Sequence, residues 1–273
     1  MSNTPEWMKR PPTDPAAEID TSVAHPARVW DYWLGGKDHF PADREVGEQI
    51  LAALPEFGVI ARADREFLGR TVRYLARDEG IRQFLDIGTG IPTANNTHEV
   101  AQSVAPESRI VYVDNDPIVL VHARALLTST PDGKTDYLDA DLRDPDAILE
   151  GAARTLDFSK PVAVSLLAIL EFVPTTEEAK SILNKLMGAT ASGSYLVISH
   201  PVHSKAMDEA GRLWNESGAT TVTIRSEDEV LSLFDDLELL DPGLVPLPLW
   251  RPAPDTQYTD REFSYYGAVG RKR

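Results

Sequence analysis

The sequence predicts an α/β fold with a mostly parallel sheet, preceded by a helical N-terminal region. From Ile81 onward, short apolar segments alternate with helical ones, which is the pattern of parallel strands joined by crossover helices. The first strand candidate runs into Asp86-Ile87-Gly88-Thr89-Gly90, a glycine turn at which backbone can approach a ligand. We therefore expect one large domain over residues 81–273, with a helical extension over residues 21–80.

Residues 1–20 are rich in proline and acidic residues and lack the pattern of a secretory signal, so we expect a flexible tail. Three helices are predicted before the sheet: Ser22–Leu34, a second one following Pro41, and Val59–Arg77. Glycine just past the last apolar residue is a typical helix end, and Gly35-Gly36 and Gly80 occupy such positions.

The domain that follows alternates strands and helices. Strands are expected at Ile81–Ile87, Arg109–Asp114, Thr135–Asp139, Pro161–Leu167 and Ser194–Ser199. Helices are expected near Thr93–Val104, Pro117–Thr128, Pro145–Ala153 and Thr176–Ala189. Two capping-box patterns, Thr175-x-x-Glu178 and Ser226-x-x-Glu229, mark helix starts. Two alternating segments, Leu237–Leu240 and Phe263–Gly270, predict a C-terminal antiparallel pair of strands joined by the proline-rich loop Asp241–Pro254.

The composition narrows the functional classes. The chain has 27 basic and 43 acidic residues, a net charge of −16, so nucleic acid and anionic membranes are disfavoured as partners. It has no cysteine, which removes disulfides, thiolate metal sites and cysteine nucleophiles and fits a cytoplasmic protein. No apolar run reaches the roughly 20 residues that a membrane-spanning helix needs.

The glycine turn predicts a nucleotide-cofactor pocket. A dinucleotide fingerprint reads G-x-G-x-x-G, but Thr93 occupies the position of its third glycine, and Asp86 stands two residues before the first. Asp114 ends the second strand, 24 positions after Gly90, where a carboxylate can accept hydrogen bonds from ribose hydroxyls. A dehydrogenase would use a ribose acid at the same place, so Asp114 alone does not separate the two classes. Asp116 is the better candidate to cap the next helix.

The stretch Gln83–Thr93 resembles motif I of the S-adenosylmethionine (SAM)-dependent methyltransferases. More narrowly, Ala27–Arg44 resembles the signature of an actinobacterial family of SAM-dependent methyltransferases formerly described as a domain of unknown function. The resemblance continues through Phe67–Leu75, Asp86–Asn95, Val111–Leu126 and Tyr266–Arg273. It implies the class I methyltransferase Rossmann-like fold, with a mostly parallel seven-stranded sheet and an antiparallel C-terminal strand. The chain departs from the family at Leu170-Glu171-Phe172, where the family usually has Leu-His-Phe.

The resemblance also implies a cofactor site. The glycine turn would hold the methionine portion of SAM, with the carboxylate of Asp86 toward its ammonium group; Asp114 would bind the ribose. An acid after the third strand and the following backbone amide would bind the adenine, and backbone after the fourth strand would face the methionine end. The cofactor-binding residues predicted in this way are Asp86, Gly88, Thr89, Gly90, Asp114, Asn115, Asp141, Leu142, Ser165 and Leu166.

Two side chains are candidate catalytic bases. Glu171 would lie near the transferred methyl group, and a partly buried glutamate with a raised pKa can accept a proton, although it could equally orient the cofactor or a substrate amine. His39 can act as a base near neutral pH. The N-terminal helices could form a lid, with Trp30 and Trp33 as packing residues. The substrate and lid candidates are Tyr32, Gly35, Gly36, Asp38 and His200, and no metal site is predicted.

These observations predict a SAM-dependent methyltransferase acting on a small-molecule acceptor. The cofactor carries its own electrophile, so the protein has chiefly to align the acceptor and exclude water, and a base is needed only if the acceptor must lose a proton. Two alternatives remain open from the residues: an NAD(P)-dependent oxidoreductase and a non-catalytic SAM-binding protein. The acceptor, its reacting atom and the oligomeric state are not predicted.

Overall fold

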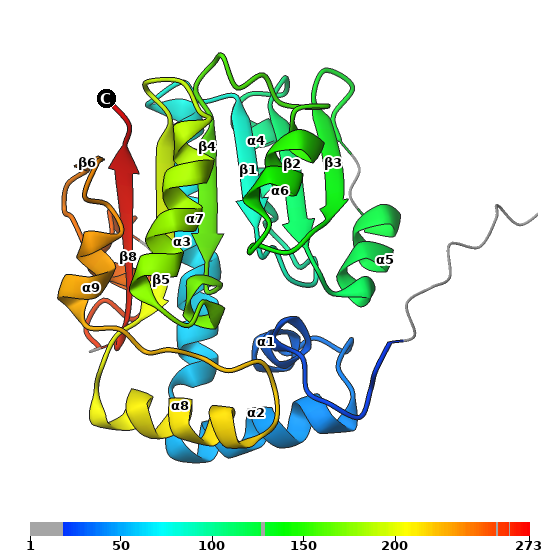
Figure 1. Ribbon diagram of the computed structural model, residues 1–273, viewed down its shortest axis with the longest axis vertical. Coiled ribbons are helices and arrows are strands. Elements are labelled where there is room, and N and C mark those ends of the chain that lie inside the picture. The colour runs from blue at the N-terminus through cyan, green and yellow to red at the C-terminus, as the bar shows by residue number, and fades with distance from the viewer. Residues whose placement is uncertain (1–18, 127–128, 255, 262) are drawn as a thin grey trace, which may run out of the picture.

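The computed structural model describes residues 19–126, 129–254, 256–261 and 263–273. The predicted flexible tail, residues 1–20, lies outside this part of the chain except for Ile19 and Asp20. A central sheet is covered by helices on both faces (Figure 1). No helix within the described residues is long and apolar enough to cross a membrane.

The strands of the sheet lie in the order β3-β2-β1-β4-β5-β8-β6, and β7 pairs with β8 outside this path. Their bounds are β1 Gln83–Ile87, β2 Arg109–Asp114, β3 Lys134–Asp139, β4 Ala163–Leu167, β5 Tyr195–Pro201, β6 Glu238–Leu239, β7 Val245–Pro246 and β8 Tyr265–Arg271. The first five are parallel to one another, and β8 is antiparallel to β5, β6 and β7. The predicted mostly parallel sheet with an antiparallel C-terminal strand is therefore confirmed.

The described sheet has eight strands where seven were expected. The additional strand is β7, two residues within the segment predicted as a proline-rich loop. Pro246 has no N–H to donate to a ladder, which fits a short strand paired on one side only. The addition lengthens the antiparallel end of the sheet and leaves the parallel part, where the predicted ligand residues lie, unchanged.

Alternation along the buried strands divides the core into two clusters, one on each face of the sheet. On β1, Phe84 belongs to the cluster that includes α3 and α4, whereas Leu85 and Ile87 belong to the cluster that includes α6 and α7. The helices are α1 Pro26–Leu34, α2 Pro41–Ala53, α3 Phe57–Arg77, α4 Thr97–Val104, α5 Pro117–Leu126, α6 Pro145–Ala152, α7 Thr176–Gly188, α8 Lys205–Glu216 and α9 Glu227–Ser232. Both predicted caps are present: Thr175 accepts from the Glu178 amide, and Ser226 and Glu229 bond reciprocally.

Three helices gather at the end of the sheet toward which β1–β4 point. Figure 1 shows α1, α2 and α8 below these carboxyl ends. Helix α8 was not predicted, although its buried residues recur at helical spacing, at Met207, Ala210, Gly211 and Trp214, and Ser204 caps it by accepting from the Met207 amide. The carboxyl ends of the parallel strands are therefore covered by helices that come from two distant parts of the sequence.

Candidate cofactor site and an adjacent aromatic cavity

A cavity lies between the carboxyl ends of the parallel strands and the first helix; we call it the strand-end cavity. Eight of the ten predicted cofactor-binding residues line it: Asp86, Gly88, Thr89, Gly90, Asp114, Asn115, Asp141 and Leu142. Ser165 and Leu166 do not; the residues that follow them, Leu167, Ala168 and Ile169, line the cavity instead. Parallel topology brings these strand ends together, as open α/β sheets generally do at a ligand site.

The glycine turn adopts backbone angles that side chains disfavour. Gly88 and Gly90 have φ of +73° and +65°. A Cβ on Gly88 would lie 2.7 Å from a side-chain carbon of Ile169, whereas one on Gly90 would meet nothing within 4 Å. Gly88 is therefore required by both its backbone conformation and its close approach to the segment after β4, while Gly90 leaves open space above the turn.

Substitution of Gly88 tests this requirement. We expect Gly88→Ala to lower the free energy of unfolding by about 3 kcal/mol, because left-handed strain adds to overlap with Ile169. Gly69→Ala is the matched control, since a Cβ there meets nothing and alanine is the better helix former, worth up to about 1 kcal/mol of added stability in α3. Urea unfolding of both variants measures the difference; a Gly88→Ala protein as stable as the parent would contradict the close approach.

Asp114 is fixed from two sides. Its Oδ2 accepts from the Gly90 amide at 2.8 Å and its Oδ1 from the Asp116 amide at 3.0 Å. The residue is 9% exposed and lines the cavity, so each oxygen keeps a lone pair for a further donor. Burial raises the pKa of this carboxyl. Asp116 caps α5 by accepting from the Ile118 amide, as predicted for this residue.

A second group of charges reaches the cavity from α3 and was missed from the sequence. Asp64 and Arg65 line the cavity beside Asp86. Asp86 accepts from the Thr97 hydroxyl at 2.5 Å, but Asp64 Oδ1 and Arg65 Nε are buried without a hydrogen-bond partner among the described residues. Burial raises the pKa of Asp64 to about 6 and also raises that of Asp86. The carboxylates of Asp64 and Asp86 and the guanidinium of Arg65 can therefore form further hydrogen bonds within the cavity.

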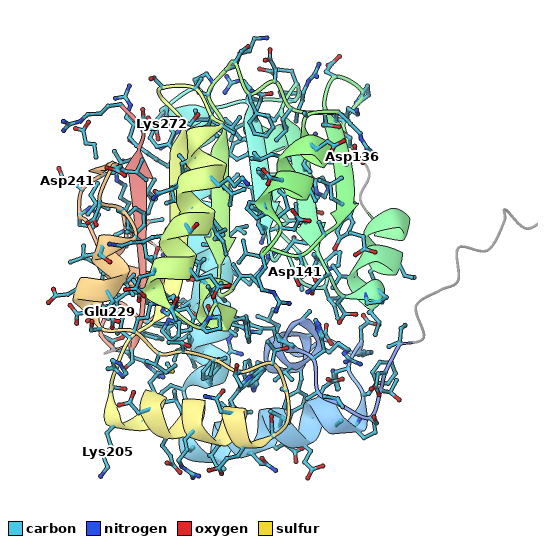
Figure 2. The ribbon with its side chains drawn as sticks, viewed as in Figure 1. Asp136, Asp141, Lys205, Glu229, Asp241 and Lys272 are labelled. Carbon is cyan, nitrogen blue, oxygen red and sulfur yellow. The ribbon has the colours of Figure 1, made fainter. Side chains whose placement is uncertain are left out.

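Asp141 closes the other end of the cavity. Its carboxylate accepts from the Arg143 backbone and guanidinium at 2.6–2.9 Å, and from Asn115 at 3.3 Å. The hydrogen bonds from Arg143 hold the pKa of Asp141 at about 2. Figure 2 shows Asp141 at the end of the sheet that faces α1, whereas Asp136, within β3, lies toward the other end. A carboxylate that is ionised and fixed in this way is a ready hydrogen-bond acceptor.

The first helix covers the cavity with a different face from the one predicted. The residues that line it, Ala27, Trp30, Asp31 and Leu34, recur at helical spacing. The predicted candidates Tyr32, Gly35, Gly36, Asp38 and His39 line neither cavity of this region. Local structure accounts for most of them: Gly35 ends α1 with φ +81°, and a Cβ on Gly36 would overlap the Asp31 carboxylate. That carboxylate accepts from the Asp38 amide at 2.8 Å and contacts His39 Nδ1 at 3.1 Å.

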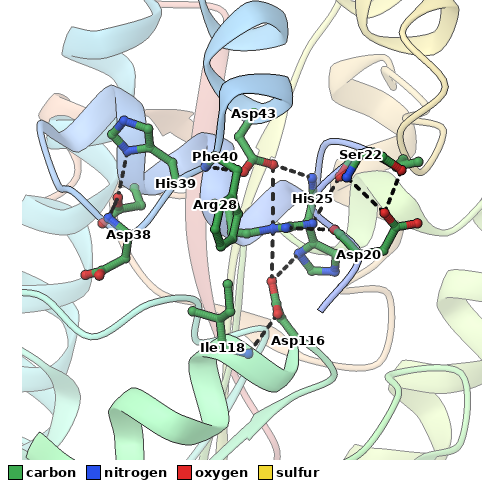
Figure 3. Close-up of polar contacts among 12 residues, drawn as sticks. Asp20, Ser22, His25, Arg28, Asp38, His39, Phe40, Asp43, Asp116 and Ile118 are labelled. Carbon is green, nitrogen blue, oxygen red and sulfur yellow. Dashed lines mark hydrogen bonds and ion pairs between the residues drawn. The ribbon is translucent and has the colours of Figure 1, made fainter. Parts of the chain in front are cut away.

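Polar contacts join the first two helices to the sheet (Figure 3). His25 Nδ1 lies 2.8 Å from Asp116 Oδ2, and Arg28 Nε lies 3.5 Å from Asp43 and 3.6 Å from Asp116. Asp43, at the start of α2, also accepts from the His25 amide at 2.9 Å. These contacts are largely buried, so they hold α1 over the turn that follows β2 more firmly than surface ion pairs would.

A second cavity, which we call the aromatic cavity, adjoins the first. Its lining comprises Trp30, Trp33, Ile50, Phe57, Glu171, Phe172, Pro201, Met207, Ala210, Gly211, Trp214, Val222, Ile224 and Tyr265. Trp30 and Phe172 line both cavities. The predicted base Glu171 therefore faces the aromatic cavity, beside the strand-end cavity, and not the strand-end cavity itself. Burial raises its pKa from an ordinary 4.5 to about 7, against a hydrogen bond from Tyr265 that lowers it.

His200, the remaining substrate candidate, lies outside both cavities. It is fully buried, with Nδ1 2.7 Å from the Pro201 carbonyl and Nε2 2.6 Å from Arg225. Burial and the charge of Arg225 lower its pKa to about 3, so the ring is neutral: Nδ1–H donates to Pro201, and Nε2 accepts from Arg225. Arg225 in turn donates to the Leu170 and Val173 carbonyls, which flank Glu171. In this arrangement His200 supports the segment that carries Glu171.

The strand order, in which the antiparallel strand β8 lies between β5 and β6, is that of the class I methyltransferase Rossmann-like fold. The model of the S-adenosyl methyltransferase family matches residues 12–273, and the chain belongs to this family. Its cofactor is SAM and it is a methyltransferase, so the family favours this activity over an oxidoreductase or a non-catalytic SAM-binding protein.

Solved structures agree with the family assignment. A DUF574 family protein from Streptomyces avermitilis is 44% identical over 93% of this chain and 100% of its own, with a TM-score of 0.90. A candidate methyltransferase from Thermobifida fusca is 38% identical over 96% and 99%, with a TM-score of 0.86. Magnesium protoporphyrin IX methyltransferase from Synechocystis, with bound S-adenosylhomocysteine (SAH), is 13% identical over 90% and 93%, with a TM-score of 0.53, and shares the fold. A comparison with curated proteins gives no match.

Proposed function

We propose that the strand-end cavity is the SAM site of this methyltransferase and that the methyl acceptor is a small molecule. The observation that carries the proposal is charge complementarity. SAM combines an ammonium group, a sulfonium, a carboxylate and a ribose diol, and the cavity combines the carboxylates of Asp64, Asp86 and Asp114 with the guanidinium of Arg65. Buried charges require such partners, because an isolated one is strongly disfavoured in a protein interior.

The unpaired atoms of the cavity fit the cofactor. Asp64 Oδ1 and Asp86 would accept from the ammonium group, and Arg65 Nε would donate to the carboxylate. Asp114, with Asn115 beside it, would accept from the ribose hydroxyls. Gly88, Thr89 and Gly90 would lie against the methionine portion. With these assignments, the unpartnered acceptor of Asp64 receives a donor and the unpartnered donor of Arg65 receives an acceptor.

The adenine would lie at the end of the cavity that Asp141 and Leu142 line. The carboxylate of Asp141 is held by Arg143, so it can accept from an exocyclic amine without rearrangement. The backbone amide of Leu142 is the matching donor. This pair recognises the two hydrogen-bonding features of the adenine edge.

A small-molecule acceptor is supported by the cover over the cavity. Helix α1 covers the cavity with Trp30 and Leu34. Contacts of His25 and Arg28 with Asp116 hold this helix in place. Such a cover excludes water from the transfer step but leaves little room for a macromolecule. The net charge of −16 disfavours nucleic acid in addition. Glu171 is the proposed base; His39, which contacts Asp31 but lines neither cavity, has no role in the proposal.

Calorimetric titration of the full chain with SAM, SAH and NAD tests the proposal. We expect SAM and SAH to bind at least about tenfold more tightly than NAD, because the cavity is matched to an amino-acid end and not to a second nucleotide. SAH release during incubation of the protein and SAM with a panel of small alcohols and amines then measures turnover. Absence of heat with both sulfur ligands, or equal affinity for NAD, would refute the assignment of the cavity.

A further inference from the structure

The aromatic cavity has a lining unlike the rest of the molecule. Six aromatic side chains contribute to it: Trp30, Trp33, Phe57, Phe172, Trp214 and Tyr265. They contact one another; the Trp33 and Phe57 ring centroids are 4.2 Å apart and those of Trp33 and Trp214 6.1 Å. The six aromatic side chains come from α1, the start of α3, the segment after β4, α8 and β8, which are distant from one another in the sequence.

The polar edges of two tryptophans are directed to backbone partners. Trp33 Nε1 donates to the Gly47 carbonyl at 3.2 Å, and Trp214 Nε1 donates to the Thr220 carbonyl at 2.7 Å. Their indole N–H groups are therefore already satisfied, and what these side chains add to the cavity is apolar ring surface. Such a surface stabilises a bound ligand because apolar area is buried and because rings of the ligand can make stacked or edge-to-face contacts.

Glu171 is the single charged side chain among the residues lining this cavity. Its Oε1 accepts from the Tyr265 hydroxyl at 2.6 Å, whereas its Oε2 is buried with no hydrogen-bond partner in the described part of the chain. The residue is only 4% exposed. A buried carboxylate oxygen without a donor is costly, so this atom identifies the position at which a ligand O–H or N–H group would be stabilised.

The aromatic cavity adjoins the strand-end cavity. Trp30 and Phe172 line both, and Phe172 follows Glu171 directly in the sequence. The unpartnered oxygens of Asp64 and Glu171 thus belong to neighbouring cavities, and the charge of Asp64 acts on Glu171. A ligand in the aromatic cavity would lie next to whatever occupies the strand-end cavity.

We propose that the aromatic cavity binds the methyl acceptor and that the acceptor is an uncharged aromatic molecule with an O–H or N–H group directed at Glu171. This assignment rests on the proposed SAM site. A carboxylate or phosphate on the acceptor is disfavoured, because Glu171 would repel it and the lining contains no cation. The rings supply most of the binding surface, and the carboxylate oxygen selects the reacting group.

The chemistry balances with Glu171 as the proton acceptor. SAM supplies an electrophilic methyl group on its sulfonium. The acceptor oxygen or nitrogen forms a bond to that methyl carbon while the carbon–sulfur bond breaks and its electron pair stays on sulfur. The acceptor proton passes to Glu171, which becomes a neutral carboxylic acid. The products are the methylated acceptor and SAH, and the proton returns to solvent when they leave.

Binding of single-ring probes tests the proposal without turnover. SAH, which has no methyl group to transfer, is bound to the full chain first, and 4-methylphenol, 4-methylaniline, toluene, 4-methylbenzoate and benzyltrimethylammonium are then titrated. Quenching of tryptophan fluorescence and calorimetry report occupation of the cavity. We expect the phenol and the aniline to bind about tenfold more tightly than toluene, since each adds a hydrogen bond to a charged group, and 4-methylbenzoate not to bind.

Three variants locate the probe. Glu171→Gln is expected to remove the preference for the phenol over toluene, and Ala210→Leu, which fills the cavity from α8, to abolish binding of both. Lys205→Gln, on the same helix but exposed at its start (Figure 2), should bind the probes as the parent does. Glu171→Gln changes the side-chain volume little, so it keeps the test decisive if Ala210→Leu fails to fold.

The outcomes separate the two proposals. Failure of SAH to bind would refute the proposed SAM site, and titration of 4-methylphenol without SAH would still decide the aromatic cavity. Normal SAH binding with no response to any ring probe, or an unchanged response in Ala210→Leu, would overturn the acceptor assignment alone. Tighter binding of benzyltrimethylammonium than of 4-methylphenol would show that the cavity selects cations and would also overturn it.

Discussion

Asp114→Asn is expected to weaken binding of both SAM and SAH by about 100-fold. The carboxylate would accept from two ribose hydroxyls, and a hydrogen bond to a charged group is worth about 1.5–3 kcal/mol. Asparagine has one acceptor oxygen in place of two, and its amide would also face the N–H groups of Gly90 or Asp116, which now donate to Asp114. A loss of about 3 kcal/mol corresponds to this change in affinity.

Asp139→Asn is the matched control for this prediction. Asp139 pairs with Asp114 in the register of β2 and β3, so it is a strand-end aspartate on the neighbouring strand. It is exposed and does not line the cavity. Calorimetry with SAH should show a large loss for Asp114→Asn and a near-parental affinity for Asp139→Asn. Equal effects in the two variants would mean that the strand ends act through general charge and not through a ribose contact.

Glu171→Gln is expected to lower kcat by about 10²- to 10⁴-fold with an acceptor that must lose a proton, the usual range for a general base. Only the ionised carboxylate can accept the proton, and burial raises its pKa to about 7. The rate of SAH formation by the parent should therefore rise with pH through about 7 and then level off. The variant should show no such rise. A parental pH profile in Glu171→Gln would exclude this residue as the base.

The raised pKa of Glu171 also predicts that the stability of the folded protein falls with rising pH, whereas the rate rises. The unfolded chain ionises Glu171 near pH 4.5, whereas the folded protein keeps the proton until about pH 7, so stability is lost as the pH rises between these values. The difference corresponds to about 3 kcal/mol above pH 7. Glu171→Gln avoids this loss and should be more stable than the parent at pH 8 by about this amount.

Urea unfolding at pH 5 and pH 8 measures this effect. Near pH 5 the folded parent retains the Glu171 proton, so the difference between parent and variant should be small there. Glu150→Gln, which changes an exposed glutamate on α6, is the control and should follow the parent at both pH values. If the difference in free energy of unfolding between the parent and Glu171→Gln does not change with pH, the pKa of Glu171 is not raised by burial.

Local sequence patterns were sufficient to predict most of the secondary structure and the strand-end residues of the candidate site. The apolar runs predicted β1–β5 to within two residues at each end, because all but the half-exposed edge strand β3 are buried on both faces of a parallel sheet. Asp86 and Asp114 could be placed at one edge because parallel strands end on the same side. The prediction of Ser165 and Leu166 was wrong by a few residues, since the cavity is lined from the end of β4 onward, by Leu167, Ala168 and Ile169.

Tertiary packing decided the rest of the site. The spacing of α1 predicted an amphipathic helix, but the residues that line the cavity include Trp30 and Asp31, whereas Tyr32 packs toward Gly47 of α2. Asp64 lies within the long α3, four residues from both Ile60 and Leu68, so helical spacing places it on the apolar face, but that spacing does not show which groups the acid faces. Its unpartnered oxygen becomes visible only when α3 is packed against the strand ends.

The sequence by itself determined the class of fold, the glycine turn and the position of Asp114 at a strand end, since these depend on backbone conformation and on residues close together along the chain. The tertiary structure alone decided that Glu171 faces an aromatic cavity, that His200 supports Arg225, and that an acid of α3 joins the site. Side chains from distant segments acquire their partners, their burial and hence their pKa values only when the elements pack. No local pattern records that environment.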